Sequence, residues 1–151
     1  MKNIINVDKR VKRENDLLFG HIQEHAIKGI LEDFFNVPLD QNDTFSVFDY
    51  SSYNLQIEVK TRRTTYSKYA TTMIPQNKVD TAIRGMDKNK YIFVFNFTDG
   101  IYYIELTKDN IQLFNQNQYG GRRDRNVNEY YSTGYCYIPI NILTKIPPKN
   151  N

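Results

Sequence analysis

The sequence predicts an α/β protein in which helices pack on a sheet of mixed strand direction. An amphipathic helical pattern runs from about residue 14 to 35, and a second one follows Pro75. Residues 91–97 form an almost continuous apolar run, which is typical of a central strand buried on both faces. The Asp99-Gly100 pair after this run predicts a hairpin, and therefore an antiparallel neighbour.

Length and composition indicate one domain over residues 1–151, large enough to bury a core without disulfides or metal. The 12 Tyr and 9 Phe are expected to supply much of the packing. No apolar run is long enough to cross a bilayer, and the first ten residues lack the apolar core of a signal peptide. A single cysteine, Cys136, cannot form an intramolecular disulfide. We therefore expect a soluble intracellular protein with no membrane partner.

Seven apolar residues share one side of the first predicted helix. They are Leu17, Ile22, Ala26, Ile27, Ile30, Leu31 and Phe34. Glu24 falls at the edge of this side, whereas His21 and His25 lie on the polar side. The negative charge of an acid that faces the core must be compensated, which a metal, a catalytic cluster or a salt bridge at the helix edge would each do.

The next part of the chain alternates between connections and strands. Residues 36–43 read as a connection, and alternating apolar residues predict a strand over 45–50. Residues 51–54 form a polar turn before a second strand over 55–62. The polar stretch 64–72 lacks periodicity and predicts a loop that can cover a bound ligand.

The second of these strands carries an acid and a base on one face. Alternate side chains of an extended strand point the same way, so Glu58 and Lys60 project together while Val59 faces the opposite side. Gln56 and Arg62 extend the polar stripe in the two directions along the strand. A solvated outer face would show the same alternation, so the spacing alone leaves both interpretations open.

The C-terminal half is read from local signals that weaken along the chain. The predicted elements are a helix from Pro75 to residue 86 or 87, strands over 91–97 and 101–106, a short helix or strand over 110–118, a last strand over 135–140 and a tail from Pro147.

The net charge of +3 does not by itself indicate a nucleic-acid partner, but the basic residues gather in three places. The clusters are Lys9, Arg10, Lys12 and Arg13; Lys60, Arg62, Arg63 and Lys68; and Arg122, Arg123 and Arg125. Each could bind phosphates or remain solvated surface. Tyr69, beside Lys68, adds a ring that can stack on a base.

Asp49 followed by Glu58-Val59-Lys60 resembles the signature of the PD-(D/E)XK, or restriction-endonuclease-like, nuclease superfamily. The resemblance covers residues 14–106 and includes Gly20-x-x-x-Glu24 on the first helix. It implies a three-layer α/β/α core with a central mixed sheet, in the order α-β-β-β-α-β. Small phage, viral and Holliday-junction resolvase-like members are the most similar in character. No proline precedes Asp49, which many members tolerate.

Phosphodiester hydrolysis needs an activated water and neutralisation of charge on phosphorus, and acids that hold Mg²⁺ or Mn²⁺ supply both. The resemblance implies that Asp49, Glu58, the Val59 carbonyl and Glu24 hold the metal. Lysine acts as a base only after losing its proton, which two neighbouring carboxylates oppose. We therefore expect Lys60 to act electrostatically.

The helix after these strands brings a glutamine or lysine to the site in many members, and Gln76 and Lys78 are the candidates here. The expected function is a metal-dependent DNA endonuclease, acting on branched or structured DNA, with RNA left open. The resemblance implies that it works in the cytoplasm or at a nucleoid or viral replication site. Resolvase-like relatives act as symmetric pairs, which implies that a homodimer can form. A non-catalytic nucleic-acid-binding domain of the same fold is the alternative.

A second motif, His21-Ile-Gln-Glu24-His25, matches the inverted zinc-peptidase pattern. Two histidines four residues apart on a helix can bind one Zn²⁺, and a distant acid such as Glu105 would complete the ligands. Against this interpretation, the histidines and Glu24 fall on different sides of the predicted helix, so ordinary surface histidines are favoured.

Overall fold

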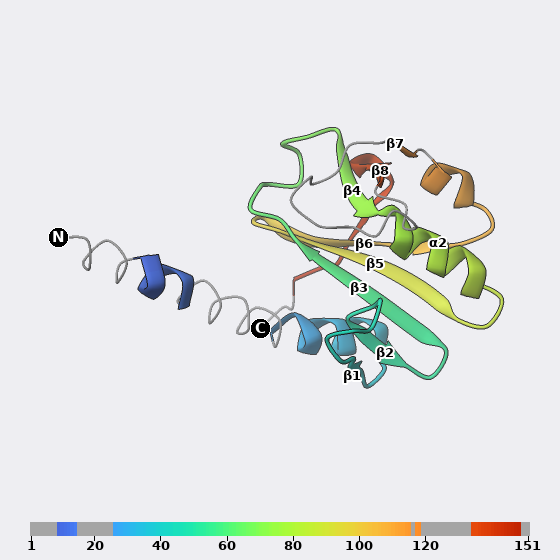
Figure 1. Ribbon diagram of the computed structural model, residues 1–151, viewed down its shortest axis with the longest axis horizontal. Helices are drawn as coiled ribbons and strands as arrows, with labels where there is room; N and C mark the ends of the chain where they lie inside the picture. Colours follow the sequence, from blue (N-terminus) through green and yellow to red (C-terminus); the bar gives the residue numbers. More distant parts are fainter. Residues whose placement is uncertain (1–8, 15–25, 116, 119–133, 149–151) are drawn as a thin grey trace. The chain divides into compact units, whose positions relative to one another are not determined.

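The computed structural model describes residues 9–14, 26–115, 117–118 and 134–148 (Figure 1). The chain divides into two compact units, Met1–Leu39 and Asp40–Asn151. Within the described ranges, no helix combines the length and apolar character needed to span a membrane.

The first unit contains helical residues 9–14 and 26–35. The second helical stretch ends at Asn36, whose φ of 55° is left-handed, a conformation that asparagine adopts readily at helix ends. Beyond it, the Val37 N–H donates to the Glu32 carbonyl at 3.2 Å and the Leu39 N–H donates to the Glu32 carboxylate at 2.9 Å. The predicted helix end near residue 35 is confirmed. Glu24 lies outside the described residues.

The second unit is built on a six-stranded sheet in the order β1-β2-β3-β5-β6-β9. Its strands are β1 (Asp40–Gln41), β2 (Tyr50–Ser52), β3 (Leu55–Thr61), β5 (Lys90–Phe97), β6 (Gly100–Leu106) and β9 (Thr144–Lys145). β3 and β5 run parallel, whereas every other neighbouring pair is antiparallel. The predicted α/β class with a mixed central sheet is confirmed.

β5 is the centre of this sheet. Its apolar residues are buried on both faces, including Phe93 and Phe95 on one side and Ile92 and Val94 on the other. Burial on both faces explains why the sequence shows a continuous apolar run here rather than alternation. The Asp99-Gly100 turn leads into antiparallel β6, as predicted.

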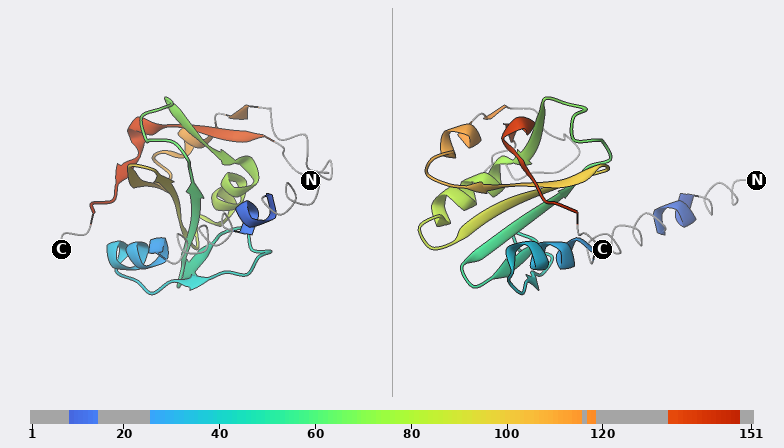
Figure 2. Two further views of the ribbon diagram at one scale, coloured as in Figure 1. Left: turned by 90° about the vertical axis from the view of Figure 1, so that its left-hand side faces the viewer. Right: turned by 180° about the vertical axis from the view of Figure 1, so that it is seen from behind.

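A second layer covers the face of the sheet that carries Phe93 and Phe95 (Figures 1 and 2). It comprises α2 (Gln76–Gly85), the 3₁₀ helices η1 (Ile111–Asn115) and η2 (Ile140–Ile142), and a three-stranded sheet of β4 (Thr71–Pro75), β8 (Tyr135–Pro139) and β7 (Asn117–Gln118) in the order β4-β8-β7. Val79 and Ala82 of α2 are fully buried in the shared core.

Cys136 of β8 lies in the same core, where its thiol donates to the Phe114 carbonyl at 2.9 Å. Burial raises the pKa of this thiol to about 11. The cysteine is therefore an unreactive packing residue, as expected of a buried thiol.

The predicted strand over 45–50 is wrong. Residues 43–49 form a loop, and β2 begins only at Tyr50. The Asp43 carboxylate accepts hydrogen bonds from the Phe45 N–H at 3.0 Å and the Ser46 hydroxyl at 3.3 Å, which offers the backbone a turn instead of a ladder. Phe45 is 97% exposed as a result.

The predicted loop over 64–72 is too long, because β4 begins at Thr71. β4 pairs with β8, sixty or more residues away in the chain, so no local pattern marks it. The expected connection at 36–43 likewise contains the two-residue β1, and β9 was not predicted.

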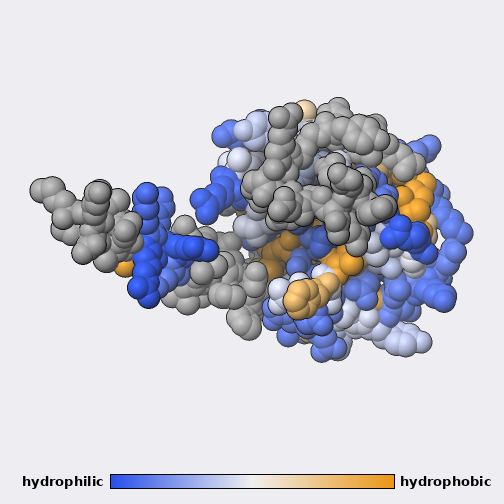
Figure 3. Space-filling view, in the orientation of Figure 1, coloured by the Kyte–Doolittle hydropathy of each residue, from blue (hydrophilic) through white to orange (hydrophobic). Residues whose placement is uncertain are grey.

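The described surface in the view of Figure 3 is largely hydrophilic, with hydrophobic residues in small separate areas. Among the large exposed hydrophobics of the described residues are four aromatic side chains: Phe34, Phe45, Tyr53 and Tyr69. Single exposed rings are common on protein surfaces, so exposure alone assigns them no role.

We expect Phe93→Ala to lower the free energy of unfolding by about 3–5 kcal/mol, because it leaves a cavity in the core. Phe93 is 1% exposed, and its ring lies 5.8 Å from that of Phe114. Phe45→Ala is the matched control and should change stability by less than about 0.5 kcal/mol. Urea unfolding of the two variants measures both, and equal losses would contradict this assignment of the core.

Candidate active site

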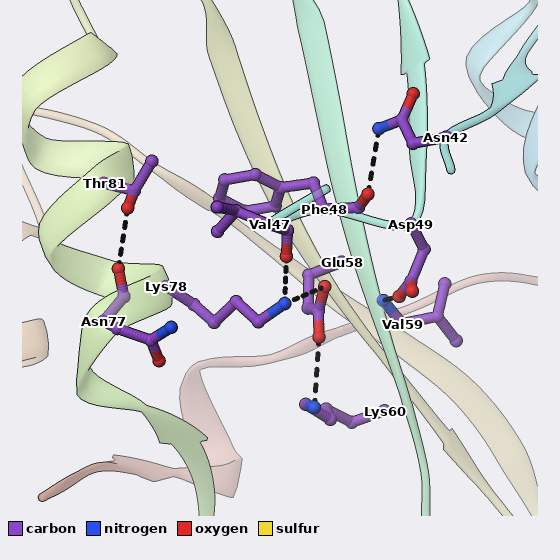
Figure 4. Close-up of polar contacts among 10 residues, drawn as sticks. All are labelled: Asn42, Val47, Phe48, Asp49, Glu58, Val59, Lys60, Asn77, Lys78 and Thr81. Atoms are coloured by element: carbon purple, nitrogen blue, oxygen red, sulfur yellow. Dashed lines mark hydrogen bonds and ion pairs between the residues drawn. The ribbon is translucent and has the colours of Figure 1, made fainter. Parts of the chain in front are cut away.

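Glu58 lies near the middle of β3 on the face covered by α2, and it is only 2% exposed (Figure 4). Both of its carboxylate oxygens contact lysines. Lys60 Nζ lies 3.1 Å from Oε1, and Lys78 Nζ lies 3.3 Å from Oε2. The predicted pairing of residues 58 and 60 on one face of the strand therefore places their charges in contact.

Lys78 reaches Glu58 from the first turns of α2. Its ammonium also donates to the Val47 carbonyl and lies 6.0 Å from the centre of the Phe48 ring. One side chain thus connects α2, β3 and the loop that precedes β2. Residue 78 was one of two candidates from this helix, but its contact with Val47 could not be expected from sequence.

Asp49 lies at the end of this loop, where β2 is about to begin. Its N–H donates to the Ile57 carbonyl at 3.0 Å, and its carboxylate accepts from the Val59 N–H at 2.8 Å. Because Tyr50 is paired with Ile57, these bonds continue the ladder and bring Asp49 next to Glu58. Asp49 is exposed, in contrast to Glu58.

The same geometry directs the Val59 carbonyl. In an antiparallel ladder, the N–H and C=O of one residue point toward the same neighbour. The Val59 N–H points to the Asp49 carboxylate, so the Val59 carbonyl also points to the side of β3 where Asp49 lies. Two carboxylates and one backbone carbonyl are thereby gathered along one short stretch of β3.

Asn42 supports this arrangement and was missed by the sequence analysis. Its side-chain amide donates to the Phe48 carbonyl at 2.9 Å, and its Oδ1 accepts from the Ser51 hydroxyl at 2.6 Å. These bonds connect Asn42 to a residue on either side of Asp49. The only signal in the sequence is an asparagine in a stretch rich in turn-forming residues.

The pKa of Glu58 is raised above the ordinary value of 4.5. Burial is the largest cause, and the charge of Asp49 adds to it. Lys60 and Lys78 oppose the shift without cancelling it. The carboxylate is therefore held in a site where its charge is only partly compensated.

The remaining candidate from α2 lies elsewhere. The Gln76 side chain is buried and donates to Asp80 Oδ1 at 2.9 Å, while its Oε1 has no hydrogen-bond partner among the described residues. Its hydrogen bond to Asp80 does not bring it to Glu58. Residues 76 and 78 are separated by about 200° around a helix, so only one of them can face a given strand.

The predicted nucleic-acid-binding residues are spread around the end of β3. Arg62 is partly buried, and its guanidinium donates to the Met73 carbonyl at 2.5 Å. Burial lowers the pKa of this guanidinium. Arg63, Lys68 and Tyr69 are exposed. A further three candidates fall outside the described residues: Arg122, Arg123 and Arg125.

Most residues of the alternative zinc site lie outside the described part of the chain. Both histidines and Glu24 fall in the undescribed stretch 15–25. Glu105 lies in β6 opposite Ile92, whose face of the sheet is the reverse of the one that carries Phe93 and Glu58. Among the described residues, no three His, Cys, Asp or Glu side chains cluster closely enough to hold a metal.

An acid immediately before β2, a Glu-x-Lys on the adjacent strand and a lysine from the following helix thus lie together, in the arrangement that the resemblance to PD-(D/E)XK nucleases leads us to expect. The model of the family described as "Phage putative PDDEXK endonuclease" matches residues 20–146. The chain belongs to this family. A search among curated proteins finds no match.

We expect Glu58→Gln to raise the unfolding temperature at neutral pH in the absence of divalent metal. The folded-state pKa of Glu58 is raised, so ionisation destabilises the folded chain. Wild type and variant should therefore be closest below pH 4.5, and the wild type should lose stability relative to the variant as the pH rises through the raised pKa.

Calorimetry in EDTA across this pH range measures the difference. Glu105→Gln, at a half-buried glutamate of β6, is the matched control. A Glu58→Gln variant that is less stable than wild type at neutral pH would show that the two ion pairs outweigh the burial of the charge.

Proposed function

We propose that the chain is a metal-dependent DNA endonuclease that hydrolyses phosphodiester bonds at Glu58. The observation that supports it best is a buried carboxylate beside a second acid, Asp49, and in contact with Lys60 and Lys78. Burial raises the pKa of this carboxyl group, and acids whose pKa is shifted by burial and by neighbouring charges are common at functional sites.

The donors at this site fit Mg²⁺ or Mn²⁺. The Asp49 and Glu58 carboxylates and the Val59 carbonyl are all oxygen ligands, which these hard cations prefer. When bound, such a cation would activate a water and neutralise charge on the phosphate. Asp49 is exposed, so a phosphate can approach it from solvent. Glu24 is proposed as a further acid on the family resemblance alone.

Lys60 is proposed as the group that stabilises negative charge in the transition state. Its side chain is 30% exposed, so it can turn from Glu58 toward a phosphate without leaving the site. A positive group placed where negative charge develops stabilises the transition state more than the same group in water, because the site is partly shielded from solvent.

Lys78 is proposed as a positioning residue. It links the Glu58 carboxylate to the Val47 carbonyl, two residues before Asp49. Through these bonds it fixes the distance between the strand that carries one acid and the loop that carries the other. Its removal should lower activity by displacing Asp49 rather than by removing a charge from the phosphate.

We expect Asp49→Ala and Glu58→Ala each to abolish Mg²⁺- or Mn²⁺-dependent nicking of plasmid DNA, because each removes a metal ligand. Lys60→Met should lower the rate about 100-fold or more, the usual effect of removing a group that stabilises transition-state charge. Glu105→Gln serves as the control. Full activity in either acid variant, or in EDTA, would rule out this mechanism.

We expect the affinity for Mn²⁺ to fall as the pH is lowered through the raised pKa of Glu58. Protons and the cation compete for the same oxygens, so binding in this range should release protons. Titration calorimetry in two buffers of different ionisation enthalpy measures the release. Proton release that persists in Glu58→Gln would place the metal elsewhere.

The preference for branched DNA and the homodimer are proposals that rest on the resemblance to resolvase-like nucleases. A cleavage panel of linear, nicked, flapped and four-way DNA, with RNA included, tests the first. Light scattering tests the second.

A non-catalytic nucleic-acid-binding domain is the second candidate. It is favoured by the lysines on both oxygens of Glu58, which compensate part of its charge without a metal ion. In that case DNA would be shifted in a gel at low salt, while no divalent metal would promote cleavage of any substrate in the panel.

A further inference from the structure

A cavity of about 330 Å³ opens at the C-terminal end of β3, beyond the part of the strand that carries Glu58 and Lys60. Its wall begins at Arg62, four residues after Glu58. Because an extended strand rises about 3.3 Å per residue, Arg62 and Glu58 lie about 13 Å apart along the chain. The cavity is enclosed by the loop 62–70 and by β4, which the sequence had not predicted as a strand.

One wall of the cavity is a fixed aromatic ring. Tyr66 stacks on Tyr102 with ring centres 4.0 Å apart and an angle of 5°, and it meets Phe97 edge to face at 5.9 Å. Its hydroxyl donates to the Ile140 carbonyl at 2.8 Å, and its N–H donates to the Asp99 carboxylate at 2.8 Å. A loop residue held by four contacts is preorganised before any ligand binds.

A second ring is accessible to a ligand from solvent. Tyr69 also lines the cavity, yet it is 61% exposed. The Lys68 ammonium lies 5.7 Å from the centre of its ring. An exposed tyrosine beside a lysine presents one surface for stacking and one charge for an adjacent phosphate.

The rest of the lining combines polar and basic residues with the apolar side chains of Met73, Phe97 and Ile140, and no acid is among the described residues that line it. Four threonines contribute hydroxyl or backbone groups: Thr64, Thr65, Thr71 and Thr72. Arg63 is exposed at the cavity, whereas Arg62 is held in the wall by its bond to the Met73 carbonyl. Neutral hydrogen-bonding groups, aromatic rings and cations suit a flat heteroaromatic ligand attached to an anion.

We propose that this cavity binds one unpaired nucleobase of the substrate strand, at a fixed number of nucleotides from the bond cleaved at Glu58. The inference rests on the proposed nuclease function and adds a base-binding subsite to it. A base in a continuous duplex must leave its stack to enter the cavity, whereas an unpaired base does so at little expense. The enzyme should therefore prefer DNA with unpaired nucleotides beside the cut.

The first experiment locates the base. Wild-type protein in EDTA is titrated with short single-stranded DNA that carries 2-aminopurine at one position in each member of a series. The fluorescence of this base changes when it leaves its stacked neighbours or stacks on a tyrosine. We expect a large change at one position only, at a constant offset from the bond that is cut in Mn²⁺. Equal changes at all positions would overturn the proposal.

The second experiment links the base to the ring. Tyr69→Ala should weaken binding of the single strand by about tenfold or more, the usual effect of losing one base–aromatic stack. An abasic nucleotide at the located position should weaken wild-type binding by a similar factor, and Tyr69→Ala should then have no further effect. Tyr53→Ala, at a tyrosine that is 92% exposed and outside the cavity lining, is the matched control.

Independent losses from Tyr69→Ala and the abasic nucleotide would overturn the base-binding subsite, as would absence of binding to any single strand. The proposed function is tested separately by cleavage in Mn²⁺. Cleavage without a located base would remove only the subsite, whereas a located base without cleavage would leave a nucleic-acid-binding domain of the same fold.

Discussion

The burial of the Glu58 carboxylate is the constraint on which the site depends. A buried ion without partners destabilises a protein by several kcal/mol, so the charge must be compensated from nearby elements. Lys60 comes from the same strand, but Lys78 requires α2 to lie over β3. That placement follows from the parallel pairing of β3 with β5, because parallel neighbours need a crossover between them, and α2 is the helix of that crossover. The strand pairing of the sheet thus also places the second lysine next to Glu58.

The elements that could be predicted from sequence are those marked by local signals. Strand alternation identified the shared face of Glu58 and Lys60, and the apolar run identified β5 as the buried central strand. Turn residues marked the start of β6, and Pro75 marked the start of α2. Each signal depends on a few neighbouring residues and needs no knowledge of the rest of the chain.

The parts that were missed depend on contacts between distant segments. β4 exists because it pairs with β8, and the loop before β2 is shaped by the carboxylate of Asp43, which overrides the alternation of Phe45 and Val47. The choice between Gln76 and Lys78 could not be made from sequence either, because it depends on how α2 is rotated against the sheet. The packing of Val79 and Ala82 into the core sets that rotation.

The direct passage from β4 into α2 determines where this chain can change in length. No connecting residue separates Pro75 from Gln76, so the register of β4 with β8 also sets the phase of the helix. One residue inserted between positions 75 and 78 would turn Lys78 by about 100° and move it by about 1.5 Å along the axis, away from Glu58. Insertions in the loop 62–70 would instead leave the ladder and the helix phase intact. Natural length variation is therefore expected in that loop, where it would reshape the cavity and leave the acids and lysines in place.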